Sequence, residues 1–181
     1  HLKANEEFPR KNYFMIEELI EKNDAKQFLE ITGGLLTHYN DGGEIDYEIF
    51  EPSEALSEGD VLSLEEKFLA GEGQNITPAR YSIDEIENKR MSSVVKDALL
   101  SVAKALNIEG YARIDAFVRI HKSKNVEVII IEVNSLPGMT PATCIFHQTA
   151  LNGYKPYDFI DKILDYGIRR SKRKNVGEKV S

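Results

Sequence analysis

The sequence predicts an α+β fold in which an antiparallel sheet is backed by helices. Two pairs of strand-like segments, each joined by a short turn, are separated along the chain by one long segment with helical periodicity. Strands joined by tight turns run antiparallel, and a helix with one apolar stripe needs a surface to cover. With 181 residues, 41% of them hydrophobic, the chain can bury a core as one domain or two small lobes.

The first strand pair lies in the amino-terminal quarter of the chain. Residues 14–20 (FMIEELI) and 28–39 (FLEITGGLLTHY) are expected to be extended. The turn sequence at 40–43 (NDGG) contains residues that accept a positive φ, and residues 44–50 (EIDYEIF) then alternate between apolar and polar. We therefore expect residues 44–50 to return as the second strand of a hairpin.

Residues 51–81 form a long, polar and irregular stretch. A connection of this length inside a compact domain is usually functional or disordered. Gly71 and Gly73, with the polar residues around them, supply few buried contacts. We therefore expect 51–81 to be a mobile loop.

A long helix follows the loop. Ser82 and Glu85 form a capping-box pattern, which predicts the start of the helix. The helix should end near Asn107. Its apolar residues recur with helical spacing at Ile86, Val94, Val95, Ala98, Leu99, Val102 and Leu106.

The second strand pair comprises residues 111–120 and 126–133, joined across a turn at 122–125. A helix is then expected over residues 143–151, followed by the turn Gly-Tyr-Lys-Pro. A final helix should run from Tyr157 to about Arg170. Residues 171–181 are expected to be frayed, as chain ends usually are.

Polar side chains converge on the second strand pair. Alternation along a strand places Arg113, Asp115 and Phe117 on one face, and Glu132 and Asn134 also share a face. Taken alone, each pattern is more typical of a solvent-facing hairpin with an ordinary ion pair. Together they form a carboxylate cluster beside apolar flanks and a Pro-Gly turn, which is costly unless a metal or a basic partner compensates it. Such an oxygen-rich set suits Mg²⁺.

A family resemblance rests on these same segments. The runs GYARIDAF and IIIEVNSLPGMTPAT, followed by GYKPY and FIDKI, closely resemble the carboxyl-terminal part of D-alanine–D-alanine ligases, members of the ATP-grasp superfamily. Glu-x-Asn occurs in many ATP-grasp enzymes, whereas its continuation into Pro-Gly-Met-Thr is more specific to this group. Upstream, EEKFLAGEGQNITPARY resembles the family's mobile active-site loop, FLEITGGLL the strand with a ribose contact, and FMIEELI the adenine hinge.

The resemblance covers nearly the whole chain and implies that residues 1–181 form a carboxyl-terminal ATP-grasp lobe. A complete ligase of this family is considerably longer. It has an amino-terminal domain that binds the first D-alanine and a Gly/Ser-rich loop that holds the ATP phosphates. No such glycine-rich loop precedes Tyr13. The sequence is therefore expected to be a fragment that is inactive alone.

The resemblance implies ATP-dependent joining of two D-alanines through an acyl phosphate, for peptidoglycan precursor synthesis. It makes Asp115, Glu132 and Asn134 ligands of two Mg²⁺ ions, with Mn²⁺ as a possible substitute and Glu132 as the bridging carboxylate. It makes Arg113 the residue that neutralises the transferred phosphoryl group, a role suited to a planar, permanent charge. Gly138 corresponds to a backbone N–H donor to the tetrahedral intermediate, where a missing Cβ permits close approach.

Three further residues bear on the substrates. Thr143 stands where the family usually has Ser to hold the acceptor carboxylate; its alternative role is a helix N-cap. Lys67 corresponds to a lysine that reaches the phosphates when the loop closes; its alternative is a solvated surface lysine. Phe68 replaces the usual Tyr and so removes one hydroxyl. The acceptor therefore stays open among D-alanine, D-lactate and D-serine.

The nucleotide side is implied by four residues. Glu17 corresponds to the acceptor for the adenine amino group, and Ile20 to the backbone donor beside it. Glu30 corresponds to the ribose ligand, and Phe117 to part of the adenine floor. The alternatives are ordinary solvated carboxylates for Glu17 and Glu30, and ordinary core packing for Phe117.

Charge and composition bear on partners and location. A net charge of -7 and a pI near 5.2 argue against general binding to nucleic acid or to anionic membranes. The apolar runs are too short to span a bilayer, and the start of the chain has no signal-peptide core. A single cysteine, Cys144, excludes an internal disulfide framework. We expect a cytoplasmic protein that binds ATP and D-alanine, with no nucleic-acid or membrane partner.

Two other functions stay open. The chain could belong to another ATP-grasp carboxylate–amine ligase or to a depsipeptide ligase, with Phe68 and Thr143 setting the acceptor. It could also be a non-catalytic, nucleotide-binding remnant. For the full-length enzyme the resemblance implies a homodimer.

Overall fold

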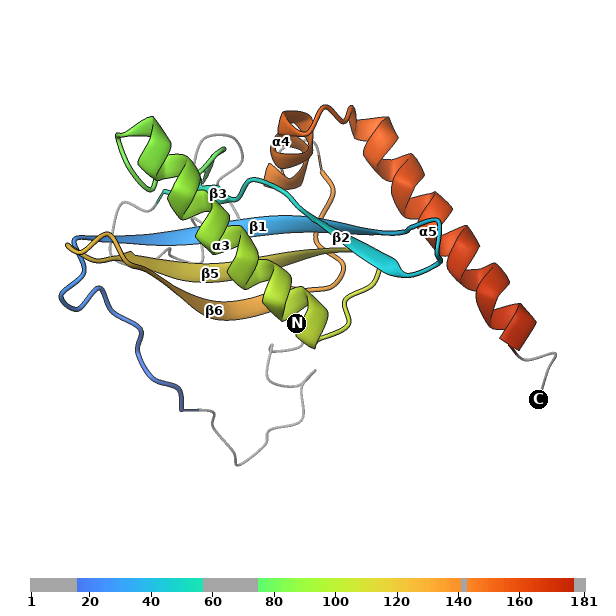
Figure 1. The fold of residues 1–181 in the computed structure, drawn as a ribbon, viewed down its shortest axis with the longest axis horizontal. Coiled ribbons are helices and arrows are strands. Elements are labelled where there is room, and N and C mark those ends of the chain that lie inside the picture. Colours follow the sequence, from blue (N-terminus) through green and yellow to red (C-terminus); the bar gives the residue numbers. More distant parts are fainter. Residues whose placement is uncertain (1–15, 57–74, 141–142, 178–181) are drawn as a thin grey trace, which may run out of the picture.

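The computed structural model describes residues 16–56, 75–140 and 143–177 (Figure 1). It contains one six-stranded sheet with the order β4-β3-β1-β5-β6, in which β2 also pairs with β1 and every pairing is antiparallel. The predicted α+β fold is confirmed. The elements in chain order are β1 (Gln27–Tyr39), β2 (Ile45–Ile49), β3 (Ser53–Ala55), β4 (Asn75–Ile76), α3 (Glu85–Ala105), β5 (Tyr111–Ile120), β6 (Val126–Asn134), α4 (Cys144–Leu151) and α5 (Pro156–Gly177).

Strand β1 is the centre of the sheet. One edge pairs with β5, and the other edge pairs first with β3, through Glu30–Thr32, and then with β2, through Leu35–Tyr39. The hairpin turn closes at Gly43, whose φ of 81° lies in the region that favours glycine. The predicted hairpin of 28–39 and 44–50 is therefore confirmed to within one residue at each end.

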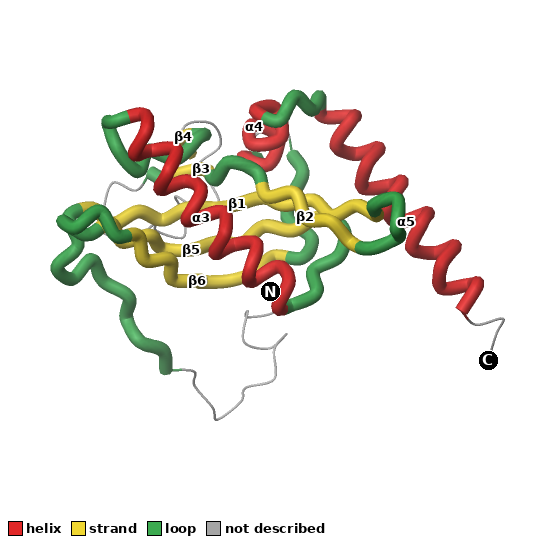
Figure 2. Tube along the Cα trace, in the orientation of Figure 1, coloured by secondary structure: helices red, strands yellow, loops and turns green. Residues whose placement is uncertain are grey.

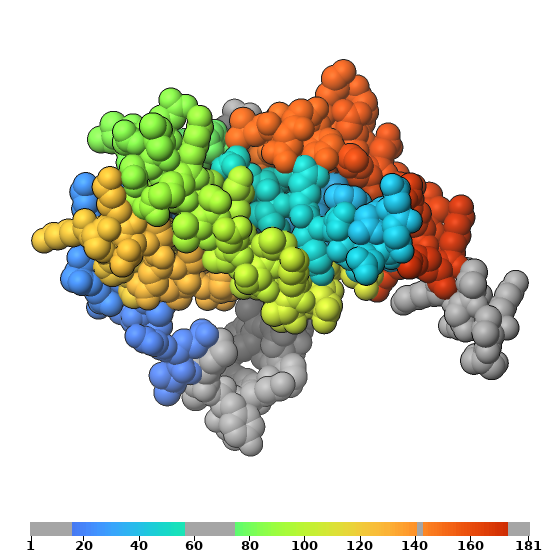
Figure 3. All heavy atoms as spheres, in the orientation of Figure 1, coloured from blue at the N-terminus to red at the C-terminus, as the bar shows by residue number. Residues whose placement is uncertain are grey.

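Helix α3 covers one face of the sheet. It lies obliquely across the strands in Figure 1, and the tube in Figure 2 shows the same crossing. The space-filling view in Figure 3 shows this side of the molecule, with α3 in green lying between β6 in orange and β2 in cyan. The buried cluster between α3 and the sheet includes residues of both and comprises Leu29, Ile31, Leu35, Ala79, Tyr81, Met91, Val95, Leu99, Ala103, Ala112, Ile114, Ala116, Val118 and Ile120.

The opposite face of the sheet is covered at one end by α4 and α5. A second buried cluster there joins Leu36 and Phe50 to Ile145 of α4 and Phe159 of α5. The phenyl ring of Phe159 meets that of Phe50 edge-on, with ring centroids 6.1 Å apart. The two clusters lie on opposite sides of β1 and fix which side chains of that strand point toward each helix layer.

The start of α3 differs from the predicted capping box. Asp84 is the N-cap, and its Oδ1 accepts a hydrogen bond from the Glu87 backbone N–H at 2.9 Å. Ser82 instead accepts from the Asp84 backbone N–H through Oγ. The predicted end near Asn107 is confirmed, since the helix ends at Ala105.

The buried stripe of α3 is also displaced from the predicted one. Met91, Val95, Leu99 and Ala103, each four residues after the last, are buried, together with Ser92. By contrast Ile86, Val94 and Leu106 are exposed. Apolar periodicity therefore predicted the helix and part of its buried side, since Val95 and Leu99 are buried as members of the predicted set.

The expectation that 51–81 is irregular throughout is wrong at both ends. Residues 53–55 form β3, and residues 75–76 form β4. Ser53, Ala79 and Tyr81 are almost fully buried. Residues 57–74, which include Lys67, lie outside the described residues. The mobility of that inner part stays a prediction.

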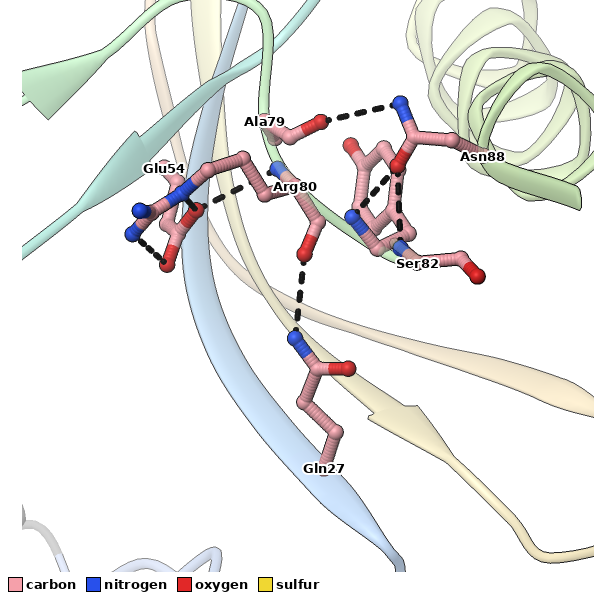
Figure 4. Close-up of polar contacts among 7 residues, drawn as sticks. Gln27, Glu54, Ala79, Arg80, Ser82 and Asn88 are labelled. Atoms are coloured by element: carbon pink, nitrogen blue, oxygen red, sulfur yellow. Dashed lines mark hydrogen bonds and ion pairs between the residues drawn. The ribbon is translucent and has the colours of Figure 1, made fainter. Parts of the chain in front are cut away.

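Hydrogen bonds fix residues 79–82 against three elements (Figure 4). The guanidinium of Arg80 donates to both carboxylate oxygens of Glu54 on β3, at 2.9 and 3.1 Å. Gln27 of β1 donates to the Arg80 carbonyl at 3.0 Å. Asn88 of α3 accepts from the backbone N–H groups of Tyr81 and Ser82 at 2.7 and 3.0 Å. Charged and polar side chains thus hold residues 79–82 in place, although their sequence is typical of a loop.

The β5–β6 hairpin is confirmed and carries an irregularity of register. Ala116 pairs with Ile130 and Asp115 pairs with Glu132, so Ile131 is the additional residue of a β-bulge. Strict alternation from Ile130, whose side chain faces the core, would place Glu132 on the core side as well. The bulge instead places Glu132 on the side of the sheet that Asp115 occupies.

The carboxyl-terminal helix is longer than expected. Helix α5 runs to Gly177, so the predicted fraying of 171–181 is wrong for residues 171–177, and 178–181 lie outside the described residues. The Arg173 guanidinium lies 4.5 Å from the ring centroid of Tyr39 and donates to the Gly43 carbonyl, which ties the helix to the hairpin turn. Within the described ranges, none of the helices is long and apolar enough to cross a membrane.

Replacing Gly34 by Ala should lower the free energy of unfolding by about 1–3 kcal/mol, the usual cost of overpacking a filled core. A Cβ at this position would lie 2.3 Å from Ile145 Cδ1 and 2.5 Å from Gln148 Oε1 of α4. Urea unfolding measures the loss. Gly167→Ala is the matched control, because no heavy atom of the described residues lies within 4 Å of its Cβ position. Equal stability of Gly34→Ala and the wild type would show that α4 does not pack on β1 as described.

Candidate active site

The predicted polar cluster lies on the sheet face opposite α3. In the strand register Thr32 of β1 is opposite Asp115 of β5, which is opposite Glu132 of β6, and Arg113 is opposite Asn134. These residues alternate with the buried core residues of β5, so their side chains share the other face. The prediction that Asp115, Glu132 and Asn134 lie on one face is confirmed by the register.

Asp115 is the centre of the cluster, and only 8% of its surface is exposed. Arg113 Nε donates to Asp115 Oδ1 at 3.0 Å, and Arg113 Nη2 donates to Oδ2 at 2.9 Å. This is the bidentate geometry, with two parallel hydrogen bonds, in which a guanidinium binds a carboxylate most strongly. The charge of this buried carboxylate is therefore compensated in the described structure.

Asn134 joins the two carboxylates. Its Nδ2 donates to Asp115 Oδ2 at 3.3 Å and to Glu132 Oε1 at 3.1 Å. The three predicted ligands thus contact one another directly. An amide that turned by half a rotation would present Oδ1 in place of Nδ2.

The donor set fits a hard divalent cation. Two carboxylates and one amide oxygen are the kind of partial ligand set that Mg²⁺ completes with water and phosphate. Among the described residues, no group of three or more His, Cys, Asp or Glu side chains is arranged to hold a metal. That finding is compatible with the predicted set, whose third member is an asparagine.

Thr32 is a site residue that the sequence did not indicate. Its hydroxyl donates to Asp115 Oδ1 at 2.6 Å. The two residues are far apart in the chain, and only the pairing of β1 with β5 brings them together. The local sequence FLEITGGLL gives no signal for this contact, because the register between strands that are distant in sequence is not encoded in either strand's alternation.

The start of α4 lies beside the cluster. Thr143 is at the N-cap position, but its hydroxyl donates to the Thr140 carbonyl at 2.8 Å and makes no capping hydrogen bond. Thr143 therefore occupies the N-cap position, as the alternative expected, but its side chain does not cap the helix. Among the described residues, the nearest heavy atom to a Cβ built at Gly138 is Thr143 Cγ2, 3.9 Å away, which is ordinary van der Waals contact.

Cys144 follows Thr143 at the first position of α4. Burial raises the pKa of the Cys144 thiol, although the positive charge of Arg113 partly opposes this effect. The thiol therefore stays protonated near neutral pH and is a poor nucleophile. This environment fits a small packing residue at the start of α4.

Gln148 holds α4 against the sheet and was also not predicted. It is fully buried, and its Oε1 accepts from the Gly34 backbone N–H at 2.8 Å. Its Nε2 donates to the Thr32 carbonyl at 2.8 Å and to Ser53 Oγ at 2.9 Å. These bonds satisfy the backbone of β1 where that strand changes partner from β3 to β2.

Two of the predicted nucleotide residues lie together. Glu30 of β1 is directly opposite Phe117 of β5, on the same face as Asp115. The ring of Phe28 stacks on that of Phe117, with centroids 4.9 Å apart. This part of the face therefore offers a flat aromatic surface beside a carboxylate.

The other nucleotide residues are not in a strand. Residues 16–20 have no regular secondary structure, so the expected extended segment over 14–20 does not form a strand in its described part. Ile16 is 92% exposed and Leu19 is 72% exposed, so these apolar side chains do not pack against the sheet as strand residues would. Glu17 is exposed and Ile20 is half-buried.

Comparison with known proteins gives one family. The family model described as D-ala D-ala ligase C-terminus matches residues 4–165. A D-alanine–D-alanine ligase of Leptospira interrogans serovar copenhageni is 29% identical over 171 residues, which cover 93% of this chain and 45% of that protein. A ligase of the same name from Chlorobaculum tepidum is 31% identical over 114 residues, which cover 63% of this chain and 29% of that protein. The chain thus spans less than half the length of these relatives.

Solved structures agree on the fold. The structure of the D-alanine–D-alanine ligase from Coxiella burnetii matches with a TM-score of 0.54 at 16% identity, over 84% of this chain and 34% of that one. The ATP complex of the Bacillus anthracis enzyme matches with a TM-score of 0.53 at 20% identity, over 81% of this chain and 40% of that one. The resemblance carried by GYARIDAF and IIIEVNSLPGMTPAT is confirmed, and the chain belongs to the D-ala D-ala ligase C-terminus family.

Proposed function

We propose that this chain is the carboxyl-terminal ATP-grasp portion of a D-alanine–D-alanine ligase. In the complete protein it would take part in the ATP-dependent joining of two D-alanines for peptidoglycan precursors. The observation that carries the proposal is the hydrogen-bonded cluster of Arg113, Asp115, Glu132 and Asn134 on a sheet face that α3 leaves uncovered. We further propose that the complete enzyme is a cytoplasmic homodimer.

The oxygens of Asp115, Glu132 and Asn134 would hold two Mg²⁺ ions, or Mn²⁺ in their place, with Glu132 shared between them. Bound there, the ions supply the neutralisation of phosphate charge that phosphoryl transfer needs. Asn134 must present Oδ1 for this task, which requires the amide to turn from the orientation described above. The chain's own part is to fix these oxygens on two adjacent strands.

Arg113 supplies a permanent positive charge next to these ligands. Its planar fork suits the oxygens of a phosphoryl group and of a tetrahedral oxyanion. Gly138 would donate its backbone N–H to that oxyanion, and Thr143 would bind the acceptor carboxylate through its hydroxyl. The lack of a closer contact at Gly138 from the described residues supports access of a substrate to the backbone.

The nucleotide would bind along the same face. Glu30 would hydrogen-bond the ribose, and the ring of Phe117 would lie under the adenine. Their side-by-side position on β1 and β5 supports this assignment. Glu17 would accept from the adenine amino group, the Ile20 backbone would donate to the ring, and Lys67 would reach the phosphates.

The acceptor defines the alternative function. Phe68 lacks the hydroxyl of the tyrosine usual in the family, so the acceptor site is not assigned to D-alanine alone. A ligase that joins D-alanine to D-lactate, or another carboxylate–amine ligase, would retain the same metal cluster. A panel of D-alanine, D-lactate and D-serine with the complete protein separates these functions.

The test compares the 181-residue chain with the complete protein in a coupled phosphate assay. Positioning of reactants contributes about 7–11 kcal/mol to such a reaction. The complete protein should release phosphate from ATP when D-alanine is added, whereas the chain alone should bind magnesium nucleotide weakly and show no turnover. Turnover by the chain alone would contradict its being an incomplete ligase. A complete protein that releases no phosphate with any acceptor would contradict the ligase function.

A further inference from the structure

The hydrogen bonds to Asp115 occupy its carboxylate completely. Oδ1 accepts from Thr32 Oγ1 and Arg113 Nε, while Oδ2 accepts from Arg113 Nη2 and Asn134 Nδ2. An ionised carboxylate has about four acceptor positions. A cation can therefore bind Asp115 only after at least one of these donors has left.

Arg113 and Asn134 are the donors that can leave. The Arg113 side chain is 34% exposed, and its long stem lets the guanidinium move to another anion. It is also a cation, so it competes directly with a metal ion for Asp115. Asn134 needs only to turn its amide, which replaces the N–H donor by an oxygen.

Thr32 cannot leave in this way. Its side chain is short and β-branched, so its rotation about χ1 is restricted. Its backbone pairs with β5 on one side and β3 on the other, and Gln148 bonds its carbonyl. Its 2.6 Å hydrogen bond is the shortest of those made to Asp115 by the described residues. When Arg113 leaves, Oδ1 of Asp115 therefore keeps one fixed donor, Thr32, whereas both donors to Oδ2 can move.

We propose that Thr32 is a positioning residue, whose hydroxyl anchors Asp115 Oδ1 so that Oδ2 faces the cation site once Arg113 has moved away. This inference rests on the proposed function, because it takes Asp115 as a metal ligand. Oδ2 is the oxygen that shares Asn134 Nδ2 with Glu132, so it is the one aligned with the second carboxylate. The Arg113 guanidinium, once it has left Asp115, would be free to bind the oxygens of the phosphoryl group.

The test measures Mn²⁺ binding to the 181-residue chain by calorimetry and by the electron paramagnetic resonance signal of free Mn²⁺. Thr32→Val removes the hydroxyl and keeps the shape, and it should weaken Mn²⁺ binding about 10-fold or more, the usual effect of losing a group that orients a ligand. Thr32→Ala should show the same loss. Thr32→Ser keeps the hydroxyl and should restore most of the affinity.

Thr37→Val is the matched control in the same strand. Thr37 is fully buried, and its hydroxyl bonds the backbone of Gly110, away from the cluster. It should lower the free energy of unfolding without changing Mn²⁺ affinity. In the complete protein, Thr32→Val should raise the Mg²⁺ concentration needed for half-maximal rate more than it lowers kcat.

Failure of this inference is distinct from failure of the proposed function. Equal Mn²⁺ affinity of the wild type, Thr32→Val and Thr32→Ala would overturn the role of Thr32 while leaving the metal site in place. Wild-type chain that binds no Mn²⁺, or binding that survives Glu132→Gln unchanged, would overturn the metal site itself, and the role of Thr32 with it.

Discussion

Replacing Glu132 by Gln should lower the turnover of the complete protein by at least about 10²–10³-fold, the cost of losing one preorganised charge at a reacting centre. The amide keeps the shape of the side chain, and its oxygen can still accept from Asn134. It cannot carry the negative charge that the proposed metal site would draw from Glu132. Phosphate release measures the loss of turnover, and urea unfolding should show nearly unchanged stability.

Cys144→Ala is the control for Glu132→Gln. The thiol is held protonated by burial and lies at the start of α4, close to the same cluster. Its removal should leave turnover nearly intact. A Glu132→Gln protein with wild-type turnover would contradict the metal role of Glu132, whereas equal losses in both variants would indicate general damage to the region.

Replacing Arg113 by Gln should reduce kcat about 10³-fold or more, since an arginine that neutralises a transferred phosphoryl group contributes on that scale. The same change should leave the Mn²⁺ affinity of the chain equal or higher, because Arg113 competes with the cation for Asp115. Phosphate release and Mn²⁺ calorimetry measure the two effects. A loss of kcat without a loss of Mn²⁺ affinity is the distinguishing result.

Arg113→Lys is the matched variant for this prediction. Lysine keeps the charge but cannot bond both oxygens of a carboxylate in one plane. It should therefore give an intermediate kcat. Parallel losses of kcat and Mn²⁺ affinity in Arg113→Gln would show that Arg113 supports the shape of the site and does not compete with the cation.

Alternation predicted correctly which polar residues share a face within each strand of the β5–β6 hairpin, because the two-residue period of side chains is a local property of a strand. Arg113, Asp115 and Phe117 alternate without interruption. The pair Glu132 and Asn134 is likewise separated by one residue. Within each strand the common side follows from the pleat and could be predicted from local sequence, whereas Asp115 and Glu132 share a side through the bulge at Ile131.

The contacts that orient Asp115 could not be predicted in the same way. Thr32 reaches it only through the pairing of β1 with β5, and Gln148 bonds β1 from a helix near the other end of the chain. The bulge at Ile131 lies within three consecutive isoleucines, which do not show which one is unpaired. Register and bulges depend on contacts between distant segments, which a single sequence does not reveal.

Polar residues caused the incorrect boundaries. Glu54 and Arg80 lie in sequence typical of a loop, yet their ion pair joins the two ends of that segment. At α3 both Ser82 and Asp84 are suitable caps, and Asn88 decides between them by holding the backbone at Ser82. At α5 Arg173 contacts the ring of Tyr39 in a part of the helix that was predicted to fray as a chain end.

The bulge also bears on how this strand can change in length during evolution. If Ile131 were lost, Ile130 would still pair with Ala116, and Glu132 would still pair with Asp115. The side chains of both parts of β6 would therefore stay on their present faces of the sheet. Loss of a residue from the regularly paired part between Val126 and Ile130 would instead reverse the faces of one part against the other. Position 131 is therefore where a lineage can lengthen or shorten β6 by one residue and still inherit both acidic groups on the same side.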